Sequence, residues 1–385
     1  MTRTKPLVVD VDSHYSEVVD ELWEYMDEPW RTRFHESRLG TYIPGAPGDR
    51  YMGGRIRRLE GGTWKPGYRT ADVQATGREG ETTRSIIVDS MKALGVDASI
   101  LVPNRLGLLA YSSARDVVVA ACDAFIDYHL DKVADAAAGI YTMPIIGWQN
   151  PEAGAATIER VGDHPAVAGV CLMSAYANPP WGDPRYHVIF ETAQRFDLPV
   201  VIHATSGGTL TEHGSFADGM QRLVESHSLS FLVSNQIHLT SMLMHGVPVR
   251  YPRLKLVFME SGVFWVPSMM YRLDEYFMKR RSEAPLLEDL PSEYVRQQCY
   301  FGTQPLEAPR DLRHMAAVFD MADGRNHLMY ASDYPHWDYD EAVAITKLSF
   351  LSDEDKARVL GENAMHVFRL TKGGTQPWQS TPSPQ

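Results

Sequence analysis

The feature that most constrains the fold of this chain is a series of short apolar runs, each followed by turn residues. Eight runs rich in Val, Ile, Leu or Tyr occur along the sequence: residues 7–12, 98–104, 138–145, 167–175, 198–205, 254–261, 298–305 and 327–335. Apolar and polar residues do not alternate cleanly within them, which is typical of strands whose two faces are both buried. The runs therefore predict a parallel sheet.

Amphipathic segments between these runs have the spacing of helices. Residues 114–135 and 184–197 are the clearest examples. Repeated strand–helix units predict either a closed (β/α)8 TIM barrel or an open doubly wound sheet. We favour the barrel, because candidate catalytic residues follow several different strands, as they do in barrel enzymes.

Two segments do not fit the strand–helix repeat. Residues 40–82 are rich in Gly, Arg and Pro and are longer than a simple loop, so they predict an inserted lid or interface. Residues 371–385 have no apolar period and predict a disordered tail. The remainder, residues 1–370, is expected to form a single domain.

Composition excludes some classes of partner. The formal net charge of -12 argues against a nucleic-acid or anionic-membrane surface. No run of about 18 apolar residues is present, and the first residues do not resemble a signal peptide. Three widely spaced cysteines are expected to be reduced thiols, so the expected location is the cytoplasm.

Polar residues at the ends of predicted strands form a candidate metal site. Asp12 and His14 are two residues apart on the first strand, so their side chains point to the same side. His203 ends the fifth strand and Asp333 ends the eighth. This nitrogen and oxygen set suits Zn, Mn or Fe.

The sequence also resembles a known family, from VDVDSH at residue 9 to ASDYPHWD at residues 331–338. Together with residues 246–277, these motifs resemble the amidohydrolase superfamily, in the branch of aminocarboxymuconate-semialdehyde decarboxylase and the resorcylate-type decarboxylases. The resemblance implies that Asp12, His14, His203 and Asp333 occupy metal-binding positions. Asp12 replaces the usual first His of that motif. Glu260 replaces a His that transfers protons in the decarboxylases, and the fourth strand lacks the Lys that bridges two metals in other members.

Further residues near these strand ends could bind metal. Glu17, His238, Glu260 and His336 predict either a second metal position or hydrogen-bonding support for the first. The sequence therefore predicts one or two divalent ions per chain.

Other residues are candidates for substrate binding. Arg272 and Arg105 could bind a substrate carboxylate, and Trp265 and Tyr271 could line the pocket. The structural alternative for Arg272 is a salt bridge with Asp274, and rim aromatics also occur as ordinary packing. A small anionic organic substrate is expected.

Three functions remain open from the sequence. The first is a metal-dependent hydrolase or non-oxidative decarboxylase, in which Asp333 and Glu260 are catalytic. The second is a dinuclear non-haem Fe or Fe/Mn oxygenase, working in a hetero-oligomer with a related barrel subunit. The third is a barrel with a structural metal that supports an active partner. The resemblance favours the first, as a homo-oligomer.

Overall fold

The computed structural model describes residues 6–15, 19–36, 83–103, 106–107, 112, 114–174, 177–204, 223–336 and 338–371. The predicted insertion at 40–82 lies outside the described residues. So does the predicted tail beyond residue 371.

All paired strands of the described chain are parallel, as the apolar runs predict. The strands are β1 Val9–Tyr15, β2 Ala98–Pro103, β3 Ile140–Tyr141, β4 Ile145–Ile146, β5 Val170–Met173, β6 Val200–His203, β7 Leu256–Met259, β8 Cys299–Gly302 and β9 Leu328–Met329. They form two ladders, β1-β2-β3 and β4-β5-β6-β7-β8-β9.

The short strands β3 and β4 are two halves of one barrel strand. β3 pairs with β2, whereas β4 pairs with β5. Between them, Thr142 donates its backbone N–H to Ala166 O, and Thr142 O accepts from Ala168 N, both at 2.9 Å. The backbone ladder therefore continues from β2 to β5, and the nine segments make eight barrel strands.

Backbone hydrogen bonds between β1 and the β9 end close the barrel. Val11 N–H donates to Tyr330 O at 3.0 Å, and Asp333 N–H donates to Asp12 O at 2.8 Å. His14 N–H then donates to Tyr334 O at 2.8 Å. The first strand thus pairs with the last, which confirms the (β/α)8 barrel and excludes the open sheet.

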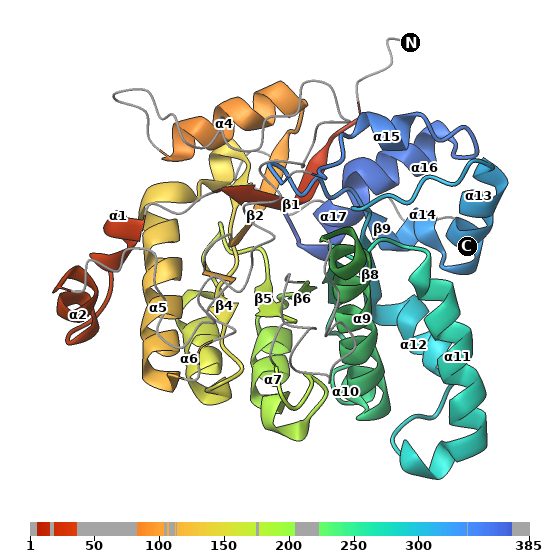
Figure 1. Cartoon of the computed structure of the whole chain (residues 1–385), viewed down its shortest axis with the longest axis horizontal. Helices are drawn as coiled ribbons and strands as arrows, with labels where there is room; N and C mark the ends of the chain where they lie inside the picture. Colours follow the sequence, from red (N-terminus) through yellow and green to blue (C-terminus); the bar gives the residue numbers. More distant parts are fainter. Residues whose placement is uncertain are drawn as a thin grey trace.

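The helices surround these strands in Figure 1, with α1 and α2 projecting at the left edge. Their bounds are α1 Val19–Trp23, α2 Trp30–Glu36, α4 Thr83–Leu94, α5 Arg115–Tyr128, α6 Pro151–Val161, α7 His187–Arg195, α9 Leu223–Met244, α10 Val247–Arg250, α11 Trp265–Arg280, α12 Pro291–Gln298, α13 Leu312–Met321, α14 Gly324–His327, α15 Val343–Thr346, α16 Asp353–Ala357 and α17 Asn363–Val367. The two predicted helical segments are confirmed as α5 with the π-helical turn His129–Val133, and as the 3-10 turn Pro184–Tyr186 with α7.

Local sequence explains several helix starts. Asn150 accepts the N–H of Ala153 at the start of α6, where Pro151 needs no hydrogen bond. Ser352 and Asp355 form a reciprocal capping box on α16. Among the described residues, none of the helices combines the length and apolar character that a membrane span requires.

The direction of the strands decides where the site lies. Because all strands are parallel, their carboxyl ends open at the same mouth of the barrel. Asp12 and His14 near the end of β1, His203 at the end of β6, Glu260 after β7 and Asp333 after β9 therefore meet there.

Candidate metal centre

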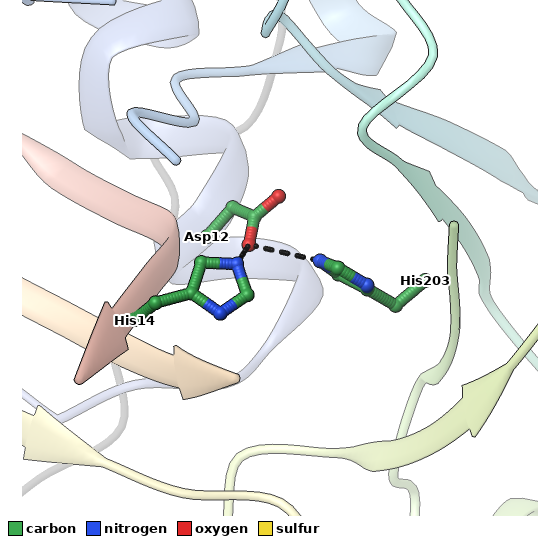
Figure 2. A group of neighbouring side chains, drawn as sticks. All are labelled: Asp12, His14 and His203. Carbon is green, nitrogen blue, oxygen red and sulfur yellow. Dashed lines mark hydrogen bonds and ion pairs between the residues drawn. The ribbon is translucent and has the colours of Figure 1, made fainter. Parts of the chain in front are cut away.

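Four predicted side chains come together at the mouth of the barrel. His14 Nε2 lies 3.1 Å from Asp12 Oδ1 and 3.1 Å from Asp333 Oδ1. His203 Nε2 lies 3.2 Å from the same oxygen of Asp12. Figure 2 shows both imidazoles turned toward the Asp12 carboxylate. All four residues are buried, so their polar groups are shielded from solvent.

Several polar atoms of this cluster lack a hydrogen-bond partner within the described part of the chain. They are Asp12 Oδ2, both ring nitrogens of His14, and His203 Nδ1. His14 Nε2 is close to two carboxylate oxygens, yet makes a proper hydrogen bond to neither. Leaving buried polar atoms unpaired is costly, and native structures rarely do so without a reason. A cation between these atoms supplies that reason, and the nitrogen and oxygen donors fit a divalent metal.

The electrostatics of the cluster agree with a cation site. Burial acts to raise the pKa of Asp12, but the His203 and His14 imidazoles outweigh it and hold the pKa below its usual range. Burial acts to lower the pKa of His14, whereas Asp12 and Asp333 raise it well above its usual value. The metal-free cluster therefore retains positive charge as protons, and a dication would displace them.

His336 and Glu260 extend the cluster on its two sides. His336 Nδ1 lies 2.5 Å from Asp333 Oδ1, and its ring is tilted by 35° to that of His14, with centroids 4.3 Å apart. Glu260 Oε2 lies 3.7 Å from His203 Nε2. Burial and the charges of Asp333 and Asp12 raise the pKa of Glu260 well above its usual value. Carboxylates and imidazoles thus alternate across the mouth.

Two groups of residues could each hold an ion. One is Asp12, His14 and His203, and the other is His14, Asp333 and His336. The donor atoms within each group lie within 4.8 Å of one another. Both groups use His14, and the four predicted ligands are divided between them. The number of ions per chain therefore stays a prediction. Metal binding by these residues stays a prediction.

The backbone at two of these carboxylates is strained. Glu260 has φ 56° and Asp333 has φ 60°, a left-handed conformation that side chains other than glycine's rarely adopt. Such strain persists where neighbouring groups hold it, and it concentrates at functional sites. Asn235 holds the Glu260 turn, because its Nδ2 donates to Met259 O at 2.8 Å and to Ser261 Oγ at 2.7 Å.

Sequence reasoning missed some residues that hold the site. Gln304 Nε2 donates to Asp333 Oδ2 at 3.3 Å and, like Asn235, carries no sequence signal of this role. Asp10 is fully buried and accepts hydrogen bonds from Ser332. The spacing of two residues that links Asp12 to His14 also links Asp10 to Asp12, so Asp10 could have been found.

His238, predicted either to bind a second metal or to support the first site, contacts backbone groups in this structure. Its Nδ1 accepts the backbone N–H of Trp181 at 3.2 Å, so its Nε2 carries the proton and donates to Ser174 O at 2.8 Å. Both nitrogens are therefore engaged in fixing backbone, and neither is left for a metal. Glu17 lies outside the described residues.

The predicted substrate-binding residues that the structure describes, Tyr271, Arg272 and Trp265, lie on α11. Tyr271 and Arg272 are exposed on α11, and Arg272 lies about 10 Å along the helix axis from its first residue. Asp274 accepts the backbone N–H of Ser292 at 2.8 Å, which ties α11 to α12. The ring of Trp265 packs on Phe258 and Phe301 in the core. Arg105 lies outside the described residues.

Known proteins are similar to this chain. The family model described as Amidohydrolase matches residues 87–370, a range that includes His203, Glu260 and Asp333 but begins after β1. A γ-resorcylate decarboxylase of Polaromonas sp. is 21% identical over 255 residues, which span 64% of this chain and 75% of that protein.

Solved structures share the fold. An amidohydrolase of Mycobacterium avium subsp. paratuberculosis superposes with a TM-score of 0.71 and 19% identity, over 96% of this chain and 100% of that one. The 5-carboxyvanillate decarboxylase of Sphingomonas paucimobilis superposes with a TM-score of 0.62 and 21% identity, over 95% of this chain and 100% of that one. A dihydroxybenzoic acid decarboxylase of Polaromonas sp. was solved with manganese and 2-nitroresorcinol. It superposes with a TM-score of 0.60 and 15% identity, over 95% of this chain and 98% of that one.

Proposed function

The chain belongs to the amidohydrolase family of metal-dependent enzymes, and from this premise we propose that it is a lyase or hydrolase of small carboxylates. Non-oxidative decarboxylation of an aromatic carboxylate is the reaction that its decarboxylase relatives favour. The observation that carries the proposal is the set of buried, unpaired donor atoms on Asp12, His14 and His203, beside Asp333.

In this proposal, some residues at the mouth of the barrel bind the metal and others transfer protons. Asp12, His14, His203 and Asp333 would hold a divalent ion. When bound, the ion supplies Lewis acidity, which polarises a substrate oxygen or lowers the pKa of a bound water. The substrate carboxylate or phenolate would bind beside these residues, because they lie at the open end of the barrel and would hold the cation.

Proton transfer falls to the carboxylates beside the metal ligands. Asp333 accepts a proton from a substrate hydroxyl or a water as general base. His336 Nδ1, 2.5 Å from Asp333 Oδ1, takes up that proton while the Nε2–H of the same ring releases one toward solvent. The His336 side chain is 28% exposed, so it connects the buried carboxylate to water. Glu260 holds a proton on its buried carboxyl group and delivers it to the substrate carbon as the bond from that carbon to the leaving CO₂ breaks, in the place of the decarboxylase His.

A second candidate function rests on the two overlapping ligand groups. Asp12, His14 and His203 on one side, and Asp333 with His336 on the other, could hold two ions with Glu260 as an additional carboxylate. Two redox-active ions so placed suit a dinuclear Fe or Fe/Mn oxygenase, with or without a related barrel subunit.

One experiment separates the two functions. The purified protein is loaded with Mn²⁺, Zn²⁺ or Fe²⁺ and incubated with 2,6-dihydroxybenzoate or 5-carboxyvanillate, with and without air. The proposal predicts CO₂ release that does not depend on O₂, and Asp333→Asn lowers the rate by about 100-fold or more. Uptake of O₂ by the Fe²⁺-loaded protein, with two metals per chain and no CO₂ release in the absence of air, would establish the second candidate instead.

A further inference from the structure

The seam where β1 meets the β9 end is irregular at the metal cluster. In a regular parallel ladder, the bond from Val11 N to Tyr330 O would be followed by one from Ser332 N to Val11 O. Instead, Ser332 N–H donates to a side-chain oxygen, Asp10 Oδ1, at 2.8 Å. The pairing of β1 with β2 also shifts register between Asp10 and Ser13. β1 therefore has a bulge against β2, and its ladder to the β9 end is irregular at the same place, just before the candidate ligands.

The Asp10 carboxylate fills this bulge and bridges both strands. Its Oδ1 accepts the backbone N–H of Asp12 at 3.2 Å in addition to that of Ser332. Its Oδ2 accepts the Ser332 hydroxyl at 2.6 Å. Asp10 and Ser332 are both fully buried, so no water competes for these hydrogen bonds. One side chain thus replaces the missing ladder bonds at the closure of the barrel.

The hydrogen-bond donors identify what Asp10 fixes. It binds the backbone of Asp12 itself, and the backbone of Ser332 directly before Asp333. The Ser332 hydroxyl oxygen also accepts the N–H of Tyr334 at 2.9 Å, which holds Asp333 from its other side. The two carboxylates that face His14 therefore depend on the same buried group for their relative position.

We propose that Asp10 is a positioning residue of the proposed metal centre, which sets the separation of Asp12 and Asp333 by hydrogen bonds across the β1–β9 seam. This inference rests on the metal site of the proposed function. Asp10 does not contact the ion. It acts as outer-shell partners of metal ligands do, whose loss weakens metal affinity about 10–100-fold.

The hydrogen-bond mechanism distinguishes two substitutions of Asp10. Asp10→Ala removes all acceptors. Asp10→Asn keeps an oxygen for the two backbone N–H groups, and its amide can donate to the Ser332 oxygen while the hydroxyl turns to Asp12 O, 3.4 Å away. A role through hydrogen bonds therefore predicts rescue by Asn, and a role through charge predicts none.

The test measures the affinity of the full chain for Mn²⁺ and Zn²⁺ by competition with a chelator, and the melting temperature separately. We expect Asp10→Ala to bind metal about 10–100-fold more weakly and Asp10→Asn to stay within about threefold of wild type. Ser332→Ala loses only the hydroxyl bonds and should weaken affinity about 3–10-fold. It decides the question if Asp10→Ala does not fold.

A matched control is a residue of α17 that contacts the amino end of β9. Buried Asn363 donates to Arg325 O and Leu328 O, and Asn363→Ala should lower the melting temperature without changing metal affinity. Wild-type affinity in Asp10→Ala or Ser332→Ala, at any loss of stability, would overturn the inference, and equal weakening in Asp10→Asn would overturn its hydrogen-bond mechanism. His203→Ala tests the site itself: full affinity there would refute the proposed metal centre, whatever the Asp10 variants do.

Discussion

Buried Asn363 at the amino-terminal end of the barrel and the residue cluster at its carboxyl-terminal mouth differ in their hydrogen bonding. At the amino-terminal end, Asn363 Nδ2 donates to Arg325 O at 3.0 Å and to Leu328 O at 2.8 Å. At the carboxyl-terminal mouth, Asp12 Oδ2 and His203 Nδ1 find no partner among the described residues. The Asn363 amide completes the protein's own hydrogen bonding, whereas the mouth keeps donor atoms unpaired and ready for a ligand.

The same contrast holds between buried histidines. The rings of His238 and His129 are fully hydrogen-bonded, the latter through Tyr15 Oη and through Thr142 Oγ1, which lies 2.6 Å from Nδ1. His14 is buried to a similar degree, but neither of its nitrogens makes a proper hydrogen bond. Burial alone therefore does not identify a metal ligand. The unpaired nitrogens of His14, beside two carboxylates, are what support its proposed role as a ligand.

The largest effect should come from removing a ligand at the mouth. His203→Ala should weaken binding of Mn²⁺ or Zn²⁺ by more than about 100-fold, because loss of a direct ligand exceeds the loss of an outer-shell partner. Metal content per chain after dialysis measures this. As a control, His238→Gln should keep its metal. Equal metal loss in both variants would erase the contrast between the two kinds of buried His.

Metal removal should lower stability next. A ligand present at 100 times its dissociation constant stabilises the folded state by about 2.7 kcal/mol. Excess chelator should therefore lower the melting temperature of the wild type by several degrees and leave His203→Ala unchanged. A chelator effect of the same size in His203→Ala would place the stabilising ion elsewhere.

The buried, hydrogen-bonded His129 should make the free energy of unfolding of the metal-free protein depend on pH. Burial lowers its pKa to about 3 from a usual 6.5. Below pH 6.5, His129 binds a proton in the unfolded chain but stays neutral in the folded chain. The free energy of unfolding therefore falls as the pH drops toward 3. The loss at pH 5 is about 2 kcal/mol. Urea unfolding of wild type and His129→Gln at pH 7.5 and 5 checks this, and parallel losses in the two proteins would contradict it.

The smallest effect concerns backbone strain at the mouth. Glu260 is left-handed, and such a residue costs about 1 kcal/mol relative to glycine. In metal-free protein, Glu260→Gly should therefore be about 1 kcal/mol more stable than Glu260→Ala, the reverse of the usual order. Urea unfolding of both variants measures the difference. If Ala were the more stable, the backbone at this carboxylate would carry no strain.

The sequence predicted the barrel and the meeting of its ligands for simple reasons. The apolar runs mark the strands, parallel strands end at one mouth, and residues two apart share a face, which brings Asp12, His14, His203 and Asp333 together. Contacts between distant segments were not predictable. No sequence pattern shows that both ring nitrogens of His238 form hydrogen bonds with the backbone of Trp181 and Ser174. None shows that the backbone N–H of Ser332 donates to Asp10.

The orientation of Arg272 is a second feature that could not be predicted from the sequence. Its residue type suits a carboxylate, but the phase of α11 turns its side chain to solvent. Helix phase relative to the barrel depends on how α11 packs on its neighbours, which the sequence of the helix does not determine. The break of one barrel strand into β3 and β4 likewise depends on the backbone between them.

The most direct test of this account is anomalous diffraction from crystals of the protein grown with Mn²⁺. The account predicts an anomalous peak at the mouth within about 2.0–2.3 Å of Nε2 of His14 and His203, and of carboxylate oxygens of Asp12 and Asp333. A second peak beside Asp333 and His336 would add the dinuclear arrangement. Fully occupied Mn²⁺ elsewhere, with this cluster free of it, would contradict the central claim.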